Sequence, residues 1–294
     1  MLSSKAMKTA LLTGADGFTG RYLEPALRAR GFGVVRLDPS GPLPCDLRNR
    51  DAVQQTVSAA QPDAVIHLGA VTFVAHGNAE DFYRVNVLGT ENLLHALAKL
   101  KRAPNRVIIA SSANVYGTPD LELVDESICP APVNHYANSK LAMEHSVRNW
   151  FARLPIVITR PFNYTGPGQA DHFLVAKIVK HFRDRAPFIE LGNLNVSRDY
   201  SDVEDVVAAY LALLESGVHS EIVNICSGRA IALMDIITIM KEIAGYEIEV
   251  RVNPEFVRDN EVPRLVGSAA KLRSLVQLPP PRPFAETLRR MYES

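Results

Sequence analysis

The 294-residue sequence predicts an α/β fold, in which a doubly wound parallel sheet is followed by a smaller C-terminal α/β lobe. Three observations lead to this prediction. Short β-branched runs alternate with longer segments of helical period from Lys8 to about Arg160. A glycine-rich stretch separates the first run from the first helical segment. After about residue 170 the alternation becomes less regular, which indicates a second lobe over the carboxyl edge of the sheet.

The first half of the chain contains the elements of the predicted sheet. Its apolar runs are almost uninterrupted, as expected for parallel strands that are buried on both faces. The predicted strands are 8–14, 33–38, 64–70, 106–112 and 156–163, and the helices between them include 20–30, 85–100 and 136–151.

The second half predicts a mixed set of elements. Helices are expected over 172–184, 202–216 and 233–245, with a short run over 189–193, a strand over 221–228 and a further run over 247–253. A last short helix follows the proline-rich segment 277–284. We expect a larger domain from 7–163 with returning segments near 200–226, and a smaller lobe from 164–199 and 227–294.

Composition excludes several classes of protein. Lys plus Arg and Asp plus Glu both number 32, so no bulk charge favours nucleic acid or an anionic membrane. The three cysteines, Cys45, Cys129 and Cys226, are too far apart for a zinc motif or a disulfide framework, and we expect packed thiols and no metal site. No apolar segment is long enough to span a membrane, and the N-terminus lacks the apolar core of a signal peptide, which favours the cytoplasm.

The stretch "TGADGFTG" places Gly14, Gly17 and Gly20 between a predicted strand and a predicted helix. Glycines at this position permit a tight turn and a close approach of the backbone to a ligand. The free N–H groups of the helix N-terminus then favour a pyrophosphate. The alternative is a glycine-rich turn that binds nothing, but the strand-to-helix context favours a dinucleotide site.

Asp38 ends the second predicted strand, about 20 residues after the glycine loop. A carboxylate there accepts hydrogen bonds from the adenosine ribose and repels a 2′-phosphate, which favours NAD(H), although the nearby Arg36 leaves NADP(H) open. Asp46 and Leu47 follow as candidates for contact with the adenine, and Asp46 is equally suited to capping a helix.

Tyr136 and Lys140 are four positions apart in a helical segment, so both project from one face. An ammonium and an oxidised nicotinamide near a tyrosine would lower its pKa and make it a usable acid or base. Ser112 ends a predicted strand, at the edge where open α/β sheets bind ligands. With a nicotinamide, these three groups supply the parts for redox chemistry between an alcohol and a ketone. Ser111 is expected to have a structural or cofactor-side role.

The motifs "TGADGFTG", "SSANVYG", "YANSK" and "RPFNYTGPGQ" resemble those of the extended short-chain dehydrogenase/reductase family, in its nucleotide-sugar branch, over about residues 8–290. The resemblance implies a Rossmann fold and a catalytic triad of Ser112, Tyr136 and Lys140. The cofactor-binding residues that it implies, with those argued above, are Gly14, Asp16, Gly17, Phe18, Thr19, Asp38, Asp46, Leu47, Leu68, Gly69, Ala70, Ala110, Tyr136, Lys140, Pro161 and Asn163.

The second lobe resembles enzymes that act on GDP-mannose-derived sugars, in the segments "HFLVAKI", "LGNLNVSRDYSDVEDVV" and "RDNEV". The resemblance implies that Asn163 contacts the sugar diphosphate, Val175 and Lys177 the base, Arg198 and Arg258 the diphosphate, and Glu261 a ribose, with Thr72 and Ser112 also in the substrate site. Arginines suit phosphates, and a carboxylate suits a ribose diol.

Two missing residue types narrow the reaction. A dehydratase of this family keeps an acidic residue just after the catalytic hydroxyl residue, where this chain has Ala113 and Asn114. An epimerising reductase places a cysteine in the segment that here reads "SSANVYG". We expect Cys129 to be a packed thiol, and His135, beside Tyr136, to be a loop histidine with a partner rather than a substrate contact.

These features favour an NAD(P)H-dependent reductase of the C4 ketone of a GDP-4-keto-6-deoxyhexose, giving GDP-rhamnose or GDP-6-deoxytalose. The alternatives are an NAD-dependent C4 epimerase of a nucleotide sugar, and a dinucleotide-sensing protein without turnover. The resemblance also implies a homodimer through the helices near 86–101 and 136–151, which have apolar residues for a second packed face.

Overall fold

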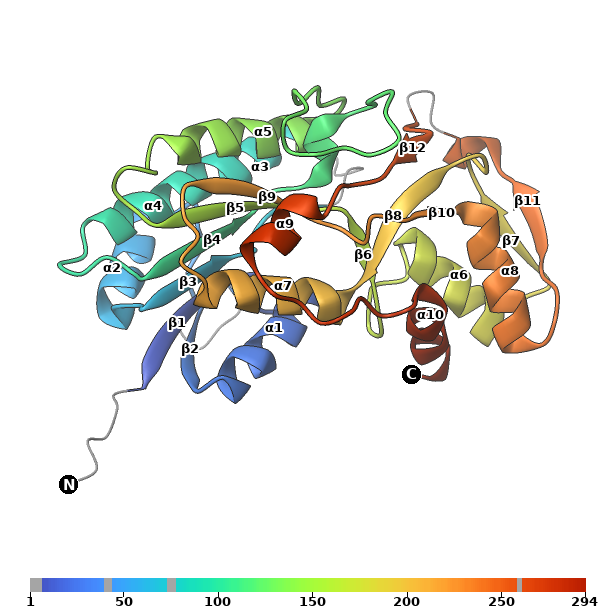
Figure 1. Cartoon of the computed structure of the whole chain (residues 1–294), viewed down its shortest axis with the longest axis horizontal. Helices are drawn as coiled ribbons and strands as arrows, with labels where there is room; N and C mark the ends of the chain where they lie inside the picture. Colours follow the sequence, from blue (N-terminus) through green and yellow to red (C-terminus); the bar gives the residue numbers. More distant parts are fainter. Residues whose placement is uncertain (1–6, 40–43, 73–77, 258–260) are drawn as a thin grey trace.

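A six-stranded parallel sheet forms the centre of the larger lobe (Figure 1). The structure is a computed structural model and describes residues 7–39, 44–72, 78–257 and 261–294. The strand order is β2-β1-β3-β4-β5-β9, and every neighbouring pair is parallel. The strands are β1 (Lys8–Thr13), β2 (Phe32–Leu37), β3 (Ala64–His67), β4 (Arg106–Ala110), β5 (Ile156–Pro161) and β9 (Glu221–Ile225).

Helices cover both faces of this sheet, because adjacent side chains of each strand point to opposite sides. Leu11 and Leu12 of β1 are both fully buried and pack into two different cores. Leu12 packs with α1 (Phe18–Ala29) and α7 (Val203–Glu215), and Leu11 packs on the other face with α2 (Arg50–Ala60), α4 (Thr90–Ala98) and α5 (His135–Arg148). The α/β fold with a parallel sheet is therefore confirmed.

The helical segment predicted over 85–100 is irregular at its start. A short helix, α3 (Ala79–Tyr83), continues as a π-helix, η1 (Arg84–Gly89), before α4 begins. π-turns of this kind often lie near functional sites. Here the π-helix contains the buried Asn86, whose side chain bonds both Val71 N and Val71 O and also the hydroxyl of Ser139.

The smaller lobe contains two short sheets and its own core. β8 (Ser197–Asp202) pairs with an antiparallel strand and two parallel ones, and a separate parallel pair lies at the outer edge. The strands are β6 (Asn163–Thr165), β10 (Ala230–Ala232), β12 (Arg264–Leu265), and the pair β7 (Phe188–Leu191) and β11 (Glu249–Val252). The helices are α6 (Leu174–Arg183), α8 (Leu233–Ala244) and α10 (Phe284–Glu293), whose apolar faces share one core.

Three short helices complete the described chain: η2 (Ala113–Tyr116), η3 (Pro254–Phe256) and α9 (Ala270–Leu275). α9 lies within the range that we expected in the smaller lobe, yet Leu272 packs into the core of the large sheet, and the helix lies beside β9. In the described ranges no helix is long and apolar enough to cross a membrane.

The strand order indicates at which edge of the large sheet a ligand would bind. Strand order reverses at β1, which has β2 on one side and β3 on the other. Ligands of open α/β sheets bind outside the carboxyl ends of strands at such a reversal. The glycine loop, the loop after β3 and the segment after β4 all leave the sheet at this edge, beside the smaller lobe (Figure 1).

Candidate active site

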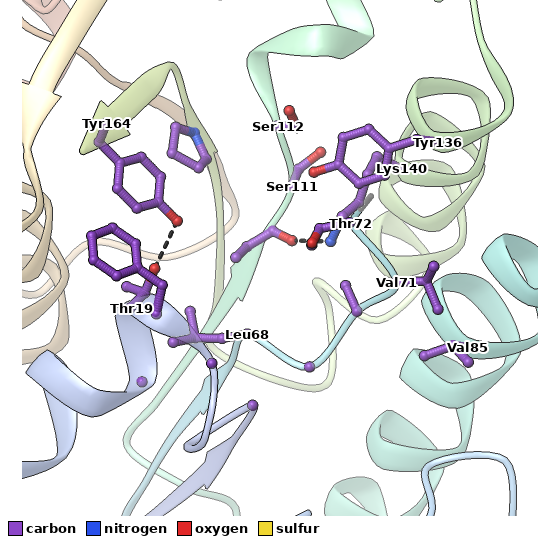
Figure 2. A pocket seen from close by; sticks show the side chains of 18 of the residues that line it. Thr19, Leu68, Val71, Thr72, Val85, Ser111, Ser112, Tyr136, Lys140 and Tyr164 are labelled. Atoms are coloured by element: carbon purple, nitrogen blue, oxygen red, sulfur yellow. Dashed lines mark hydrogen bonds between the residues drawn. The ribbon is translucent and has the colours of Figure 1, made fainter. Parts of the chain in front are cut away.

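A cavity of about 790 Å³ lies at this edge and extends between the two lobes. Every residue predicted to bind the cofactor lines it except Asp16. Of the predicted substrate residues, Thr72, Ser112, Asn163 and Val175 also line it. Figure 2 shows Thr19 and Tyr164 on one side of this space, with the serines, Tyr136, Lys140 and Thr72 on the other.

The glycine loop has the shape of a phosphate cradle. Gly14 has φ +72°, and a Cβ there would lie 2.9 Å from Gly69 N, while a Cβ on Gly20 would overlap the Gly14 carbonyl. No side chain caps α1 at Gly17, and its first turn has no acidic residue. The N–H groups of that turn therefore face the cavity without a competing carboxylate, which fits the pyrophosphate of a dinucleotide.

Asp38 directly follows β2 and forms hydrogen bonds with the backbone of the glycine loop. Its carboxylate accepts hydrogen bonds from Gly14 N at 2.6 Å and Ala15 N at 3.0 Å. Burial raises the pKa of Asp38, and these two hydrogen bonds oppose the rise. Asp38 thus shapes the loop, and its contact with a ribose stays a prediction.

Asp46 lines the cavity but does not cap a helix. The Nε and Nη2 of Arg48 bond its carboxylate. The N-cap of α2 is instead Asn49, whose side chain accepts from Ala52 N at 3.1 Å. The capping interpretation of Asp46 is therefore wrong, because Asn49 stands directly before the helix.

Ser112 caps a short helix and also lines the cavity. It is the N-cap of η2, where its Oγ accepts from Asn114 N at 3.2 Å, and it also forms a hydrogen bond with the Tyr136 hydroxyl. The helix α5 brings Tyr136 to this point, with only 9% of its surface exposed. Burial raises the pKa of Tyr136 to about 12, and the bond with Ser112 opposes part of that rise.

Lys140 lies one turn after Tyr136 and is also buried. Its Nζ donates to the Ala110 carbonyl at the end of β4, at 2.7 Å (Figure 2). Burial lowers the pKa of Lys140 to about 8, while the negative charge of Glu144 opposes the fall. A lowering of the tyrosine pKa by Lys140 stays a prediction for the cofactor-bound protein.

A buried ion pair, Glu144 with Arg160, supports Ser111. Glu144 and Arg160 have side chains that are 1% and 2% exposed, and their closest atoms are 2.5 Å apart. Ser111 Oγ donates to Glu144 at 2.5 Å, and the Arg160 guanidinium stacks on the Tyr116 ring at 4.8 Å. The Ser111 hydroxyl therefore joins the end of β4 to α5, and because Ser111 also lines the cavity, a role on the cofactor side stays a prediction.

A second buried network supports the loop after β3. His67 Nε2 donates to Thr90 Oγ1, because that hydroxyl donates its own proton to the Asn86 carbonyl. His67 Nδ1 then accepts from Thr13 Oγ1, which itself accepts from Gly69 N at 2.8 Å. Burial lowers the pKa of His67 to about 3, so the ring is neutral and holds the backbone of the cofactor loop.

Carboxylates line only one part of the cavity. Asp38 holds the glycine loop, Asp46 bonds Arg48, and the charge of Asp81 also acts on Arg48. Ala113, next to Ser112, is buried, and Asn114 lines the cavity as an amide. The tyrosine end therefore lacks the acid that a dehydration needs, as far as the described residues extend. No three His, Cys, Asp or Glu side chains in those ranges are placed to hold a metal ion.

Several predicted substrate residues lie apart from the cavity lining. Lys177 Nζ donates to the Glu190 carbonyl at 2.7 Å and lies 4.5 Å from the centre of the Phe256 ring. Arg198 forms an ion pair with Glu261, which lines a separate hollow of about 250 Å³ in the smaller lobe. Arg258 lies outside the described residues. Binding by these four residues stays a prediction.

Several aromatic residues of the cavity, unlike Phe18 and Tyr136, were not predicted from the sequence. Tyr164, Phe173, Tyr200 and Tyr210 all line it. Tyr164 OH lies 2.7 Å from Thr19 Oγ1 and its ring stacks on Phe18, so it joins the glycine loop to β6. The motif "RPFNYTGPGQ" contains Tyr164 and was a signal for it, whereas the others come from elements that only the fold brings together.

His135 and Cys129, which precede Tyr136 in the sequence, do not line the cavity. His135 is exposed and is the first residue of α5, so the expectation of a loop residue is wrong, because Asn134 caps the helix directly before it. Its Nδ1 has the expected partner and lies 3.3 Å from the Tyr83 hydroxyl. Cys129 is exposed, so the expectation of a packed thiol is wrong there, because its loop runs over the surface. Cys45 and Cys226 are buried free thiols.

Two curated relatives are similar along most of the chain. GDP-6-deoxy-D-talose 4-dehydrogenase from Aggregatibacter actinomycetemcomitans is 38% identical over 90% of this chain and 90% of its own. GDP-6-deoxy-D-mannose reductase from Pseudomonas aeruginosa is 34% identical over 95% of this chain and 94% of its own. Both names describe redox enzymes of GDP-linked 6-deoxyhexoses.

Solved structures show the same fold over 97% of this chain. A putative epimerase from Burkholderia cenocepacia superposes with a TM-score of 0.91 at 47% identity, over 97% of that chain. RMD from Pseudomonas aeruginosa, complexed with NADPH, superposes with a TM-score of 0.87 at 32% identity, over 98% of that chain. Residues 10–226 match the NAD dependent epimerase/dehydratase family, and with the glycine loop and the Ser112, Tyr136 and Lys140 cluster in one cavity, the chain belongs to that family.

Proposed function

We propose that this protein is an NAD(P)H-dependent reductase, with NAD(H) preferred, that acts on the C4 ketone of a GDP-linked 4-keto-6-deoxyhexose. One observation carries the proposal. The cavity joins a dinucleotide cradle to Ser112, Tyr136 and Lys140, while its described carboxylates hold the glycine loop or act on Arg48. That arrangement supplies redox chemistry at a hydroxyl or ketone without an acid for dehydration.

When bound, the reduced nicotinamide supplies a hydride to C4 of the sugar. The Tyr136 hydroxyl donates its proton to the C4 oxygen, so the ketone becomes an alcohol. Ser112 hydrogen-bonds the same oxygen and stabilises the charge that develops there. Lys140 holds the nicotinamide ribose, and its positive charge favours the tyrosinate that remains until solvent returns a proton.

The pKa of Tyr136 suits the reductive direction. Burial raises it to about 12, so the hydroxyl is protonated at neutral pH and ready to act as the acid. The oxidative direction needs the tyrosinate, which the same burial disfavours. Reduction is therefore the direction in which the free protein already holds the required proton.

The smaller lobe supplies the proposed nucleotide site. We assign cofactor binding to 7–163 with segments near 200–226, and nucleotide-sugar binding to 164–199 and 227–294. Asn163 and Val175 line the cavity where the lobes meet. Arg198, Lys177 and Glu261 lie on the same lobe, and their charges suit a diphosphate and a ribose. Diphosphate binding by Arg258 stays a prediction from the sequence. The product is GDP-rhamnose or its C4 epimer, GDP-6-deoxytalose.

The test is the reaction of the purified protein with GDP-4-keto-6-deoxymannose and NADH or NADPH. We expect loss of absorbance at the wavelength of the reduced nicotinamide, and one 6-deoxyhexose product whose C4 configuration is read by NMR. Tyr136→Phe serves as the inactive control. Cofactor binding without oxidation, across a panel of 4-keto sugar nucleotides, would overturn the proposal in favour of a dinucleotide sensor.

A C4 epimerase is the second candidate, because it needs the same three side chains and the structure from Burkholderia cenocepacia is described as a putative epimerase. Such an enzyme oxidises and re-reduces the sugar with one bound cofactor. It therefore interconverts C4 epimers without net consumption of NADH. Interconversion of two GDP-6-deoxyhexoses with no added cofactor would favour it over the reductase.

We also propose a homodimer that forms through η1, α4 and α5. Leu88 of η1 is 57% exposed, so an apolar side chain on this face is available for contact with a second copy of the chain. Light scattering after gel filtration measures the mass in solution. We expect twice the chain mass for the wild type and a shift toward monomer for Leu88→Glu.

A further inference from the structure

Arg36 lies at the ribose end of the proposed cofactor site and is bound by carboxylates. Its Nε and Nη2 donate to Glu24 Oε2 at 2.8 and 2.5 Å. Its Nη1 donates to Asp16 Oδ1 at 3.1 Å. The side chain is 35% exposed, and Arg36 does not line the cavity but lies directly before Leu37 and Asp38, which do.

The position of this guanidinium follows from the elements that hold it. Arg36 lies on β2, and Asp38 follows the last residue of that strand, two positions further along the chain. Asp16 precedes Gly17 in the glycine loop, and Glu24 lies on α1. The negative charge of Asp38 also acts on Arg36. The arginine is therefore placed between the strand end, the loop and the helix that would surround an adenosine ribose.

Glu24 is the main holder of Arg36. Its side chain is only 11% exposed, and a second arginine, Arg28, donates to its other oxygen at 2.7 Å. Burial favours the neutral acid, but the hydrogen bonds from Arg36 and Arg28 outweigh it and hold the pKa of Glu24 below its usual value. The carboxylate is thus ionised at neutral pH and held on both sides.

An arginine is the group that receives a 2′-phosphate in this type of site. Here two of its three nitrogens already bond Glu24 and the third bonds Asp16. Three carboxylates, on Asp16, Glu24 and Asp38, surround it, so the region is negative despite the arginine. A 2′-phosphate would meet this negative field and would have to displace Arg36 from a well-formed ion pair.

We propose that Glu24 is a specificity-determining residue, which holds Arg36 away from the cofactor and so makes the site favour NAD(H) over NADP(H). The inference rests on the proposed function for the cofactor site alone and not on the identity of the sugar. Glu24 lies on α1 and does not line the cavity, whereas Asp38 does. Both residues would contribute to the preference for NAD(H) over NADP(H).

The test is the dissociation constant of NADH and of NADPH, measured by nicotinamide fluorescence without any sugar. We expect the wild type to bind NADH more tightly. Glu24→Gln keeps the shape but removes the charge, and we expect the ratio of the two constants to shift toward NADPH by about tenfold, the value of one charge-assisted hydrogen bond. The double variant Glu24→Gln/Arg36→Met should lose that shift.

Two further variants keep the test decisive. Asp16→Asn removes the other partner of Arg36 from an exposed position and should shift the ratio in the same direction, even if Glu24→Gln folds poorly. Glu215→Gln is the matched control. It removes the carboxylate that pairs with Arg30, which lies at the C-terminal end of α1, away from Glu24 and Arg36. The ratio of the NADH and NADPH dissociation constants should not change in this variant.

Tighter binding of NADPH by the wild type would overturn the inference. So would an unchanged ratio in both Glu24→Gln and Asp16→Asn, or a shift that persists without Arg36. Failure to bind either cofactor would overturn the proposed function and this inference together, whereas binding with an unchanged ratio would overturn the inference alone.

Discussion

The hydroxyl of Ser111 donates a 2.5 Å hydrogen bond to the carboxylate of Glu144, and this bond joins the end of β4 to α5. The proposed catalytic serine follows Ser111 directly on one element, and Tyr136 and Lys140 stand on the other. The distance between the three proposed catalytic groups is therefore fixed by a bond that contains none of them. Arg160 completes the arrangement by neutralising Glu144 in the core.

Glu144→Gln should destabilise the protein, because it leaves the Arg160 guanidinium buried without a counter-charge. We expect the free energy of unfolding to fall by about 3 kcal/mol in denaturant titrations. Asp184→Asn, which breaks the exposed pair with Lys180, is the control and should cause no measurable change. Equal stability of the two variants would show that the buried pair is not needed.

Tyr136→Phe should remove most of the turnover, about 10² to 10⁴-fold, because the C4 oxygen loses its proton donor. The dissociation constant for NADH should stay close to that of the wild type, since the ring is retained. Steady-state kinetics and a fluorescence titration measure the two effects separately. Full activity in this variant would rule out the tyrosine mechanism.

Ser112→Ala should lower kcat by about 10²-fold, because a hydrogen bond to the developing charge on the C4 oxygen is lost. The lost cap of η2 should cost about 1 kcal/mol in stability. Ser111→Ala is the neighbouring control, with a similar loss of stability and a smaller loss of kcat. If the two variants had the same kcat, Ser112 would have only its capping role.

Lys140 should give the reductive reaction an alkaline limit. Its pKa is about 8 in the free protein, so the ammonium is charged below that pH and neutral above it. We expect kcat/KM for NADH to fall as the pH rises through about 8. Lys140→Arg stays charged and should remove this inflection from the profile, even at reduced activity. A wild-type profile that is flat from pH 7 to 10 would contradict this role.

His67 should make the protein less stable in mild acid. Its pKa falls from the ordinary 6.5 to about 3 on folding, so between these values the unfolded chain binds a proton that the folded protein does not. The free energy of unfolding should therefore decrease as the pH falls below 6.5, by about 1.4 kcal/mol per pH unit from this residue. His67→Gln should show a shallower slope between pH 6.5 and 5, and an unchanged slope would contradict it.

Most of the large sheet was predictable because its signals are local. A buried parallel strand needs a continuous apolar run, and each such run in the first half became a strand. The mixed sheet around β8 was not predictable, because its short strands pair across long separations in sequence. Asn163 of β6, for example, pairs with Tyr200 of β8, and neither segment has a strong pattern of its own.

The glycine loop, the helical spacing of Tyr136 and Lys140, and the polar end of β4 could be predicted from the amino-acid order alone, because each depends on neighbours along the chain. The contacts that these groups make could not be predicted in this way. Asp38 bonds the loop amides, Lys140 bonds a carbonyl, and Glu24 holds Arg36, since these partners lie on different elements. Partner choice follows from burial and distance in space, which one-dimensional spacing does not contain.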